Sequence, residues 1–253
     1  MKPQPYSKYI KVCKDAVKND EVFATFRSHP EYERVVEACG RRHGIAYLTV
    51  IRTLFPHLLQ YFPLFQTSET VGAPKKYYYK SSRSHRFSPT TLRYIKVLGD
   101  LEQLFGKLDG MDIVEIGGGY GGQCKIIFDY AKPRSYTIVD LPGALKLAEK
   151  YLTHFGIDNV QYKKPNDSFD NSYSLCISNY AFSEVSYGYQ KIYAKKILKH
   201  SAMGYMTCNH FHRSKTRLMY DLDIFKVKRG KFSPETPLTG EGNKLYTWKH
   251  IAK

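Results

Sequence analysis

The segment that most constrains the fold runs from Asp112 to Tyr130. It begins with an apolar strand pattern, Asp112–Ile116, continues through six residues of which five are glycine, and then shows helical spacing from Gly122 to Tyr130. A strand that turns through glycines directly into a helix is typical of the opening unit of a doubly wound α/β sheet. We therefore expect a parallel sheet whose ligand lies at this turn.

Strand and helix patterns continue to alternate after this segment. Such alternation indicates parallel strands joined by crossover helices. Two last strand patterns, Ile224–Lys228 and Lys244–Trp248, have no helical pattern between them and predict an antiparallel hairpin at the edge of the sheet. The predicted fold is α/β and Rossmann-like: a doubly wound, mostly parallel sheet with a C-terminal antiparallel edge hairpin.

The N-terminal part of the chain has a different pattern. Residues 1–87 show mostly helical spacing and end in a basic, Tyr-rich segment, Val71–Arg86, which lacks any period and is expected to be a loop. Ser88 and Pro89 then supply N-cap and first-turn signals for a helix that leads into the α/β part. We predict a helical N-terminal region over residues 1–87 and a ligand-binding domain over residues 88–253.

The glycines indicate the class of ligand. Gly117, Gly119 and Gly122 satisfy the spacing G-x-G-x-x-G at the end of a strand. Such a turn lets a ligand approach the backbone and the N-terminus of the following helix. The spacing predicts a nucleotide-type ligand, but it does not separate a dinucleotide from S-adenosylmethionine.

Glu115 separates these two ligands. It lies between Val114 and Ile116 in a strand of buried type, so a solvated surface position explains it poorly. A dinucleotide would place its pyrophosphate at this turn, where a carboxylate repels it. S-adenosylmethionine carries an α-ammonium and a sulfonium and no phosphate. The expected cofactor of the domain is therefore S-adenosylmethionine.

Asp140 provides a second indication. It follows the predicted strand Ser135–Val139 and stands 21 positions after Gly119 (140 − 119), close to the spacing expected for a ribose-binding acid. Its alternative role is the N-cap of the helix that follows Leu141. We predict that Asp140 and Leu141 contact the cofactor, and that Asp167, in a polar group after the third strand, lies near the adenine.

The acceptor should lie beyond the carboxyl ends of the fourth and fifth strands. Methyl transfer to a hydroxyl requires positioning and a general base, for which Glu184 and His210 are the candidates. Their alternatives are a carboxylate at a helix start and an exposed loop residue. Asn179 and Asn209 are expected to orient groups, because an amide has no useful pKa, and Tyr180 is expected to line the pocket, as is Tyr120 from the glycine turn.

Charge and composition bear on the partner and the compartment. The formal net charge is +16, which favours an anionic partner, although excess Lys also serves solubility. The N-terminus is polar and basic and the five cysteines show no C-x-x-C spacing, so we expect a cytoplasmic protein. No apolar run is long enough for a membrane span, and no compact Asp/Glu/His cluster predicts a metal site.

Several segments resemble a family of sugar O-methyltransferases of class I, which depend on S-adenosylmethionine. The similarity covers about two-thirds of the chain, from Gly72 to the C-terminus. The matching segments are Ser88–Tyr94, Val114–Gln123, Val139–Pro142, Leu147–Leu152, Ile177–Glu184, Pro237–Thr239, Asn243 and Trp248.

The resemblance implies a Rossmann-like enzyme that methylates a sugar hydroxyl of a glycan or nucleotide-sugar. It implies a cofactor site at Glu115, Gly117, Gly119 and Asp140. It also implies an acceptor region, whose candidate residues are Arg93, Tyr120, Asn179, Tyr180, Glu184 and Asn209. Tyr120 and Asn179 are also expected to contact the cofactor.

Two other functions compete with this one. An RNA methyltransferase is favoured by the net charge and by the basic segment Lys75–Arg86. Against it, the turn after the fourth strand reads Ser-Asn-Tyr-Ala and not Asn-Pro-Pro-Tyr, and Asn179 stands where ribose methylation would need an acid. The other competitor is a catalytically silent module that keeps the fold. The sequence leaves the sugar, its hydroxyl and the oligomeric state open.

Overall fold

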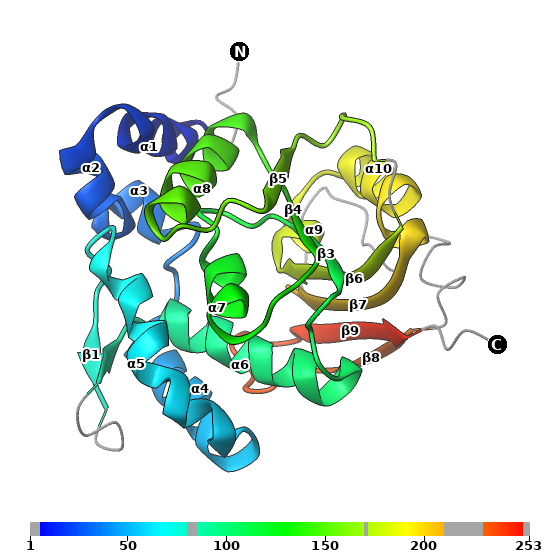
Figure 1. The fold of residues 1–253 in the computed structure, drawn as a ribbon, viewed down its shortest axis with the longest axis horizontal. Coiled ribbons are helices and arrows are strands. Elements are labelled where there is room, and N and C mark those ends of the chain that lie inside the picture. Colours follow the sequence, from blue (N-terminus) through cyan, green and yellow to red (C-terminus); the bar gives the residue numbers. More distant parts are fainter. Residues whose placement is uncertain (1–5, 80–84, 170–171, 210–229, 250–253) are drawn as a thin grey trace. The chain divides into compact units, whose positions relative to one another are not determined.

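The computed structural model describes residues 6–79, 85–169, 172–209 and 230–249 (Figure 1). The chain divides into two compact units. Unit 1 contains residues 1–104, 119–131 and 141–158, and unit 2 contains residues 105–118, 132–140 and 159–253. Unit 2 carries the large sheet, and unit 1 carries most of the helices.

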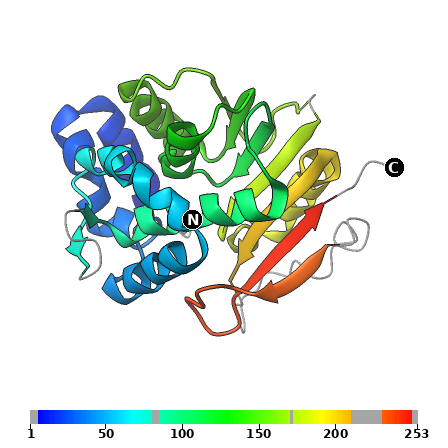
Figure 2. The ribbon, with the colours of Figure 1, turned by 60° about the horizontal axis from the view of Figure 1, so that its bottom comes forward.

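Unit 2 is built on a seven-stranded sheet with the order β5-β4-β3-β6-β7-β9-β8. Strands β3 to β7 pair in parallel, β9 is antiparallel to β7, and β8 is antiparallel to β9. Figure 2 shows β9, in red, beside β7, with β8, in orange, beyond it. The strands are β3 (Asp112–Ile116), β4 (Ser135–Val139), β5 (Val160–Lys163), β6 (Tyr173–Asn179), β7 (Ser201–Cys208), β8 (Lys231–Pro234) and β9 (Lys244–Lys249).

This arrangement confirms the predicted fold class, a mostly parallel sheet with an antiparallel hairpin. The order of the five parallel strands is the 3-2-1-4-5 order of a doubly wound sheet. One feature differs from a dinucleotide-binding sheet, because β9 runs in the opposite direction between β7 and β8. The predicted strand Lys244–Trp248 corresponds to β9, whereas Ile224–Lys228 lies outside the described residues.

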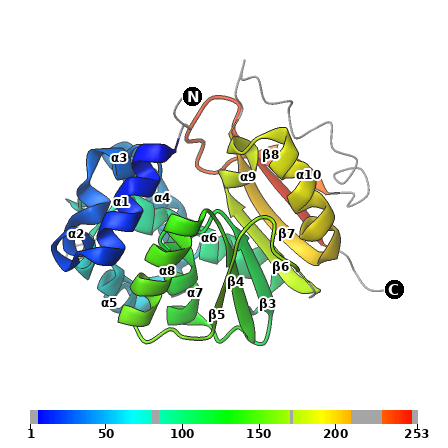
Figure 3. The same cartoon turned by 90° about the horizontal axis from the view of Figure 1, so that it is seen from above.

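Two helices of unit 2 cover one face of this sheet (Figure 3). They are α9 (Ala181–Glu184) and α10 (Tyr187–Lys196). Phe182 and Tyr193 from these helices pack against buried strand residues such as Cys176 and Met206. The apolar area removed from water at this face is the main source of stability for the strands that it covers.

One glycine of the sheet is required by a neighbouring ring. Gly204 of β7 pairs with Trp248 of β9, and a Cβ atom added to Gly204 would lie 2.0 Å from the indole ring. Trp248 is 3% exposed, and its Nε1 donates a hydrogen bond of 3.1 Å to the carbonyl of Ser201. The ring therefore packs directly against Gly204 and joins β9 to the backbone of β7.

Unit 1 is mostly helical. Its helices are α1 (Ser7–Lys18), α2 (Asp20–Thr25), α3 (Pro30–Glu33), α4 (Arg41–Leu54), α5 (Phe62–Phe65), α6 (Pro89–Phe105), α7 (Gly122–Tyr130) and α8 (Pro142–His154). Short 3-10 helices cover Phe26–Ser28, Pro56–Tyr61 and Gln66–Thr70. The Tyr-rich segment that we predicted as a loop also contains a short antiparallel pair, β1 (Tyr77–Tyr78) and β2 (Arg86–Phe87).

The compact units do not divide the chain at residue 87. Helix α6 begins where the cap signals predict, and the Ser88 hydroxyl accepts a hydrogen bond of 3.2 Å from the amide of Thr91. Helices α6, α7 and α8 nevertheless belong to unit 1, together with the N-terminal helices. The division at residues 87 and 88 describes the sequence pattern, whereas the packing joins these three helices to the N-terminal region.

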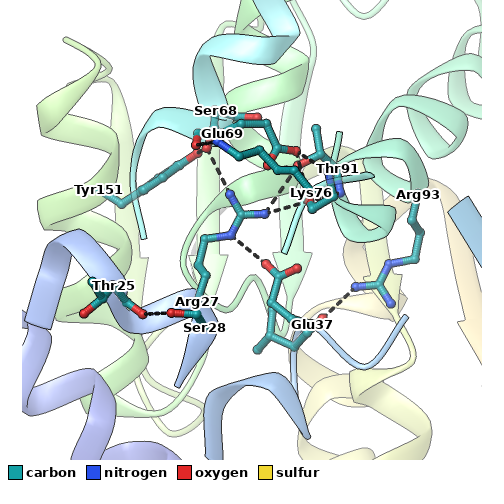
Figure 4. A network of polar contacts seen from close by, with 12 residues as sticks. Thr25, Arg27, Ser28, Glu37, Ser68, Glu69, Lys76, Thr91, Arg93 and Tyr151 are labelled. Atoms are coloured by element: carbon teal, nitrogen blue, oxygen red, sulfur yellow. Dashed lines mark hydrogen bonds and ion pairs between the residues drawn. The ribbon is translucent and has the colours of Figure 1, made fainter. Parts of the chain in front are cut away.

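A buried arginine connects the N-terminal helices of unit 1 to the start of α6 (Figure 4). The side chain of Arg27 is fully buried and its Nε lies 2.6 Å from a carboxylate oxygen of Glu37. Its other nitrogens donate to the carbonyl of Ser68 at 3.0 Å and to the hydroxyls of Ser88 at 3.0 Å and Thr91 at 3.4 Å. Every arm of this guanidinium therefore has an acceptor, as a buried charge requires.

We predict that Arg27→Met destabilises the protein strongly. The substitution leaves the buried Glu37 carboxylate without its cation, and loss of one partner of a buried pair costs about 3–5 kcal/mol. The measurement is urea denaturation followed by circular dichroism. The matched control is Arg34→Met, because Arg34 pairs with Glu31 while 71% exposed, and such a pair contributes only about 0–1 kcal/mol. Equal losses in the two variants would contradict the structural importance of the Arg27 network.

Candidate functional site

The glycine turn of unit 2 begins directly after β3. Gly117 has a φ of +78°, and a Cβ atom added to it would lie 2.0 Å from the Cβ of Ala181. A Cβ atom on Gly118 would lie 2.8 Å from Ile138 and 3.2 Å from a carboxylate oxygen of Glu115. Both positions therefore need glycine, the first for its backbone conformation and both for the close approach of neighbouring atoms.

Glu115 lies beneath this turn. Glu115 is 2% exposed, and its Oε2 accepts a hydrogen bond of 2.8 Å from the hydroxyl of Tyr136. A buried carboxylate is stable only when it is hydrogen-bonded or when a positive charge is nearby. When ionised, this carboxylate would attract cations and repel phosphates at the turn above it.

Asp140 follows β4, the strand next to β3. The amide of Gly117 donates a hydrogen bond of 2.8 Å to the carbonyl of Val139, so the ends of the two strands are adjacent. Helix α8 has Leu141 as its N-cap residue and no side-chain cap, so the structure does not show the capping role considered for Asp140. Burial raises the pKa of Tyr193, and the negative charge of Asp140 adds to this effect.

Asp167 lies in the turn after β5, and its carboxylate takes part in that turn. Its Oδ2 accepts a hydrogen bond of 2.8 Å from the amide of Lys164. Lys196 of α10 donates to the backbone carbonyls of Asn166 at 3.0 Å and Asp167 at 2.9 Å. The contact of Asp167 with adenine stays a prediction. The structure places Asp167 in a hydrogen-bonded turn at the carboxyl edge of the sheet.

Two predicted acceptor residues are brought together in unit 2. The Asn209 side chain donates a hydrogen bond of 2.5 Å to Oε1 of Glu184, and the Asn209 amide donates to the Ser183 hydroxyl at 3.1 Å. Asn179 is the last residue of β6, and the segment that contains Ser183 and Glu184 follows shortly after it. His210, the second candidate base, lies outside the described residues.

Tyr180 has an unusual backbone and a fully engaged hydroxyl. Its φ is +68°, which a residue with a side chain rarely adopts and which costs on the order of 1–3 kcal/mol. Its hydroxyl donates to a carboxylate oxygen of Glu235 and lies 3.2 Å from the hydroxyl of Thr239. Sequence reasoning did not identify Glu235, because no motif or spacing connects it to Tyr180, 55 positions earlier.

The remaining predicted residues belong to unit 1. Tyr120 is fully buried, and the guanidinium of Arg27 lies 4.8 Å from the centre of its ring. Four rings pack edge-on or tilted against it: Phe26, Tyr32, Tyr94 and Tyr151. Burial raises the pKa of Tyr120. Its side chain is therefore part of the core of unit 1, and only its backbone is available to a cofactor.

Gly119 and Arg93 also lie in unit 1. Gly119 has a φ of +57°, and a Cβ atom added there would approach no atom closer than 3.8 Å, in Val36. Arg93 of α6 donates to the carbonyl of Val36 at 3.4 Å and lies 3.6 Å from the sulfur of Cys39. Within unit 1, Gly119 and Arg93 therefore both lie next to the segment that contains Val36 and Cys39.

The described residues bear on three further features: a metal site, a membrane span and a ligand cavity. Within the described ranges, no three His, Cys, Asp or Glu side chains form a group that could hold a metal ion. The helices of those ranges include none that is long and apolar enough to cross a membrane. A cavity of about 400 Å³ in unit 1, lined by residues that include Glu37, Lys75 and Tyr77, contains none of the predicted site residues.

No protein-family model matches the chain, and no curated protein matches it. Among solved structures, the chain is similar to a protein of Thermoplasma acidophilum, with 14% identity and a TM-score of 0.45 over 64% of this chain and 91% of the other.

Two further structures are similar to a comparable degree. An rRNA methylase from Streptococcus thermophilus has 13% identity and a TM-score of 0.44 over 57% of this chain and 91% of its own. The pyocyanin biosynthetic protein PhzM has 12% identity and a TM-score of 0.44 over 64% of this chain and 58% of its own. Identities and TM-scores this low leave the assignment of function to the chain's own residues.

We predict that Gly117→Ala destabilises unit 2 more than a glycine substitution without a steric conflict. Positive φ and the collision with Ala181 together cost about 2–5 kcal/mol. The control is Gly106→Ala, because Gly106 has a φ of +87° and nothing within 4 Å of an added Cβ, so only the conformational cost of about 1–2 kcal/mol applies. Urea unfolding of both variants measures the difference, and equal losses would show that the contact with Ala181 is unimportant.

Proposed function

We propose that the protein is an S-adenosylmethionine-dependent methyltransferase that acts on a sugar hydroxyl. The observation that carries the cofactor is the buried carboxylate of Glu115 beneath the glycine turn after β3. Asp140 stands at the end of the adjacent strand β4. This is the point where the strand order reverses, β4 lying on one side of β3 and β6 on the other, which is where doubly wound sheets bind ligands.

The residues of this edge fit S-adenosylmethionine better than a dinucleotide. A pyrophosphate at the turn would meet the Glu115 carboxylate, one oxygen of which lies 3.2 Å from a Cβ atom placed on Gly118. An α-ammonium group would be attracted there instead. The missing Cβ of Gly117 makes room for Ala181, and the Asp140 carboxylate is the group that would accept hydrogen bonds from ribose hydroxyls.

The chain's own groups would assist transfer in the following way. The sulfonium of the bound cofactor supplies an electrophilic methyl group. Glu184 accepts the proton of the attacking hydroxyl, and Asn209, at 2.5 Å, holds the Glu184 carboxylate in one orientation. Asn179, at the end of β6, orients the reacting groups. His210 is the second candidate for the base.

The sugar acceptor is supported by the residues that resemble sugar O-methyltransferases. Tyr180, Thr239 and Asn243 all belong to the matching segments, and the hydroxyl of Tyr180 is bonded within this group. A tyrosine held in this way is poorly suited to stack on a flipped nucleobase, because its position is determined by Glu235. An anionic or nucleotide-linked sugar would also suit the net charge of +16.

One observation favours RNA as a second candidate acceptor. In the β1–β2 pair, the Arg86 guanidinium lies 4.7 Å from the ring centre of Tyr78, and Lys75 lies 5.8 Å from that of Tyr77. Tyr78 is 64% exposed. Cations beside exposed aromatic rings are a common arrangement for single-stranded nucleic acid. A silent module that binds the cofactor without turnover is the remaining alternative.

We predict that the purified protein binds S-adenosylhomocysteine and not NADH in calorimetric titration. Asp140→Asn should weaken this binding about tenfold or more, because it removes charge-assisted hydrogen bonds to ribose. The control is Asp112→Asn, which alters the opposite end of β3 and the ion pair with Arg134. Unchanged affinity in the Asp140 variant would disprove its ribose contact, and absence of S-adenosylhomocysteine binding would disprove the cofactor.

We also predict that Glu184→Gln keeps cofactor affinity and lowers turnover about 10²–10⁴-fold, because it removes the general base. Turnover is measured as transfer of labelled methyl groups to nucleotide sugars, anionic oligosaccharides and single-stranded RNA. The wild-type rate should rise with pH as Glu184 loses its proton, and the variant should lack this acidic limb. A wild-type rate in the variant would assign the base to His210 or another group, and methylation of RNA alone would favour the second candidate.

A further inference from the structure

The loop between β8 and β9, residues 235–243, is fastened by a buried carboxylate. Glu235 is 5% exposed, and its Oε1 accepts a hydrogen bond from the hydroxyl of Tyr180. Its Oε2 accepts hydrogen bonds from the amide of Thr239 at 3.2 Å, from the hydroxyl of Thr239 at 2.6 Å and from the side chain of Asn243 at 3.1 Å. Neutral donors thus satisfy both oxygens. We call the set formed by Tyr180, Glu235, Thr239 and Asn243 the Glu235 latch.

The latch lies at the carboxyl edge of the sheet. Lys244, the first residue of β9, pairs with Cys208 at the end of β7, so the loop that precedes it stands beside the end of β7. Tyr180 comes directly after β6, the parallel neighbour of β7. The latch therefore joins an otherwise separate hairpin loop to the edge where doubly wound sheets bind their ligands.

The residue that the latch holds has a strained backbone. Tyr180 has a φ of +68° and a ψ of −31°. Its amide donates to the carbonyl of Thr207 at 2.9 Å, and its own carbonyl accepts from the amide of Ser183 at 2.9 Å. Such a conformation persists only where the surroundings determine it, and the contact between its hydroxyl and Glu235 adds a constraint from a distant part of the chain.

The turn that Tyr180 belongs to packs against the glycine turn. The next residue, Ala181, is the one whose Cβ would lie 2.0 Å from a Cβ atom added to Gly117. Ser178 holds the same two segments, since its hydroxyl donates to the carbonyl of Ile116 at 3.1 Å and accepts from the amide of Phe182 at 3.1 Å. A displacement of Tyr180 would therefore move atoms that lie directly against Gly117.

We propose that Glu235 is a positioning residue for the cofactor: through Tyr180 it holds the turn after β6 against Gly117. The inference rests on the proposed function. It assigns to Tyr180 a role different from contact with the acceptor, because the hydroxyl that would make such a contact is bonded within the latch. A residue that supports a binding turn from behind acts on the part of the ligand that touches that turn.

The experiment compares two ligands in four variants. S-adenosylhomocysteine carries the amino-acid part that would lie at the glycine turn, whereas 5′-methylthioadenosine keeps the adenosine and lacks that part. The variants are Tyr180→Phe, Glu235→Gln, the double substitution, and the control Tyr246→Phe. The control loses a hydroxyl that accepts from the amide of Gly230 at 3.2 Å, within the same sheet and outside the latch. Titration calorimetry gives each Kd, and thermal melting reports the folded state.

The proposal expects Tyr180→Phe and Glu235→Gln each to weaken S-adenosylhomocysteine about tenfold and to leave 5′-methylthioadenosine within about twofold. The double variant should be no weaker than the weaker single variant, because both changes break the same contact. Tyr246→Phe should bind both ligands as the wild type does. If Glu235→Gln does not fold, Tyr180→Phe decides alone, since it removes only one hydroxyl.

Three results would overturn the proposal. Unchanged S-adenosylhomocysteine affinity in a folded Tyr180→Phe variant would show that the latch does not act on the cofactor turn. Equal weakening of the two ligands would assign the latch a general structural role. Failure of the wild-type protein to bind S-adenosylhomocysteine would disprove the proposed function and this inference together. If the wild type binds and either of the first two results is obtained, only the inference is disproved.

Discussion

The parallel pairing of β3 with β4 on one side and β6 on the other determines where the proposed site residues of unit 2 lie. Parallel strands bring their carboxyl ends to one edge, so residues that are far apart in the chain, such as Glu115, Asp140 and Asn179, meet there. Short turns follow β3 and β5 at this edge, and α9 begins directly after Tyr180. The chemistry of the edge is therefore set by the few residues that follow each strand.

A second constraint is the cost of burying carboxylates. Glu115 is held by Tyr136, Glu235 by Tyr180, and Glu37 by Arg27. In the first two cases a tyrosine hydroxyl donates the hydrogen bond. When such a carboxylate is ionised, it places a negative charge close to the sheet edge, where it would attract a cationic ligand. The third carboxylate is neutralised by a guanidinium and serves the packing of unit 1.

Local signals made much of the sheet predictable. The bounds of β3, α7 and β4 agree with the apolar runs and glycines that delimit them, because short buried strands and glycine turns leave few alternatives. The second strand of the hairpin was also predicted, at Lys244–Trp248. What could not be predicted was its place between β7 and β8, since the order of strands depends on pairings between distant residues.

The site was predictable to a smaller extent. The positions of Glu115 and Asp140 follow from where their strands end, and the structure places both at the expected edge. The side chains of Tyr120 and Tyr180 were expected to line a pocket, whereas one lies in the core of unit 1 and the other bonds to Glu235. An aromatic residue in a motif has no pattern that distinguishes these surroundings, because they are formed by residues such as Arg27 and Glu235 that lie far away in the chain.

The packing of Trp248 on Gly204 has a consequence for how such chains diverge. The indole occupies the space of a side chain at position 204, so a larger residue there is compatible only with a smaller one at position 248. A chain that changes one of them alone has either a collision or a cavity over β7. Positions 204 and 248 should therefore vary together among related sequences. Such covariation would identify β9 and its register against β7 in chains too different for their motifs to be recognised.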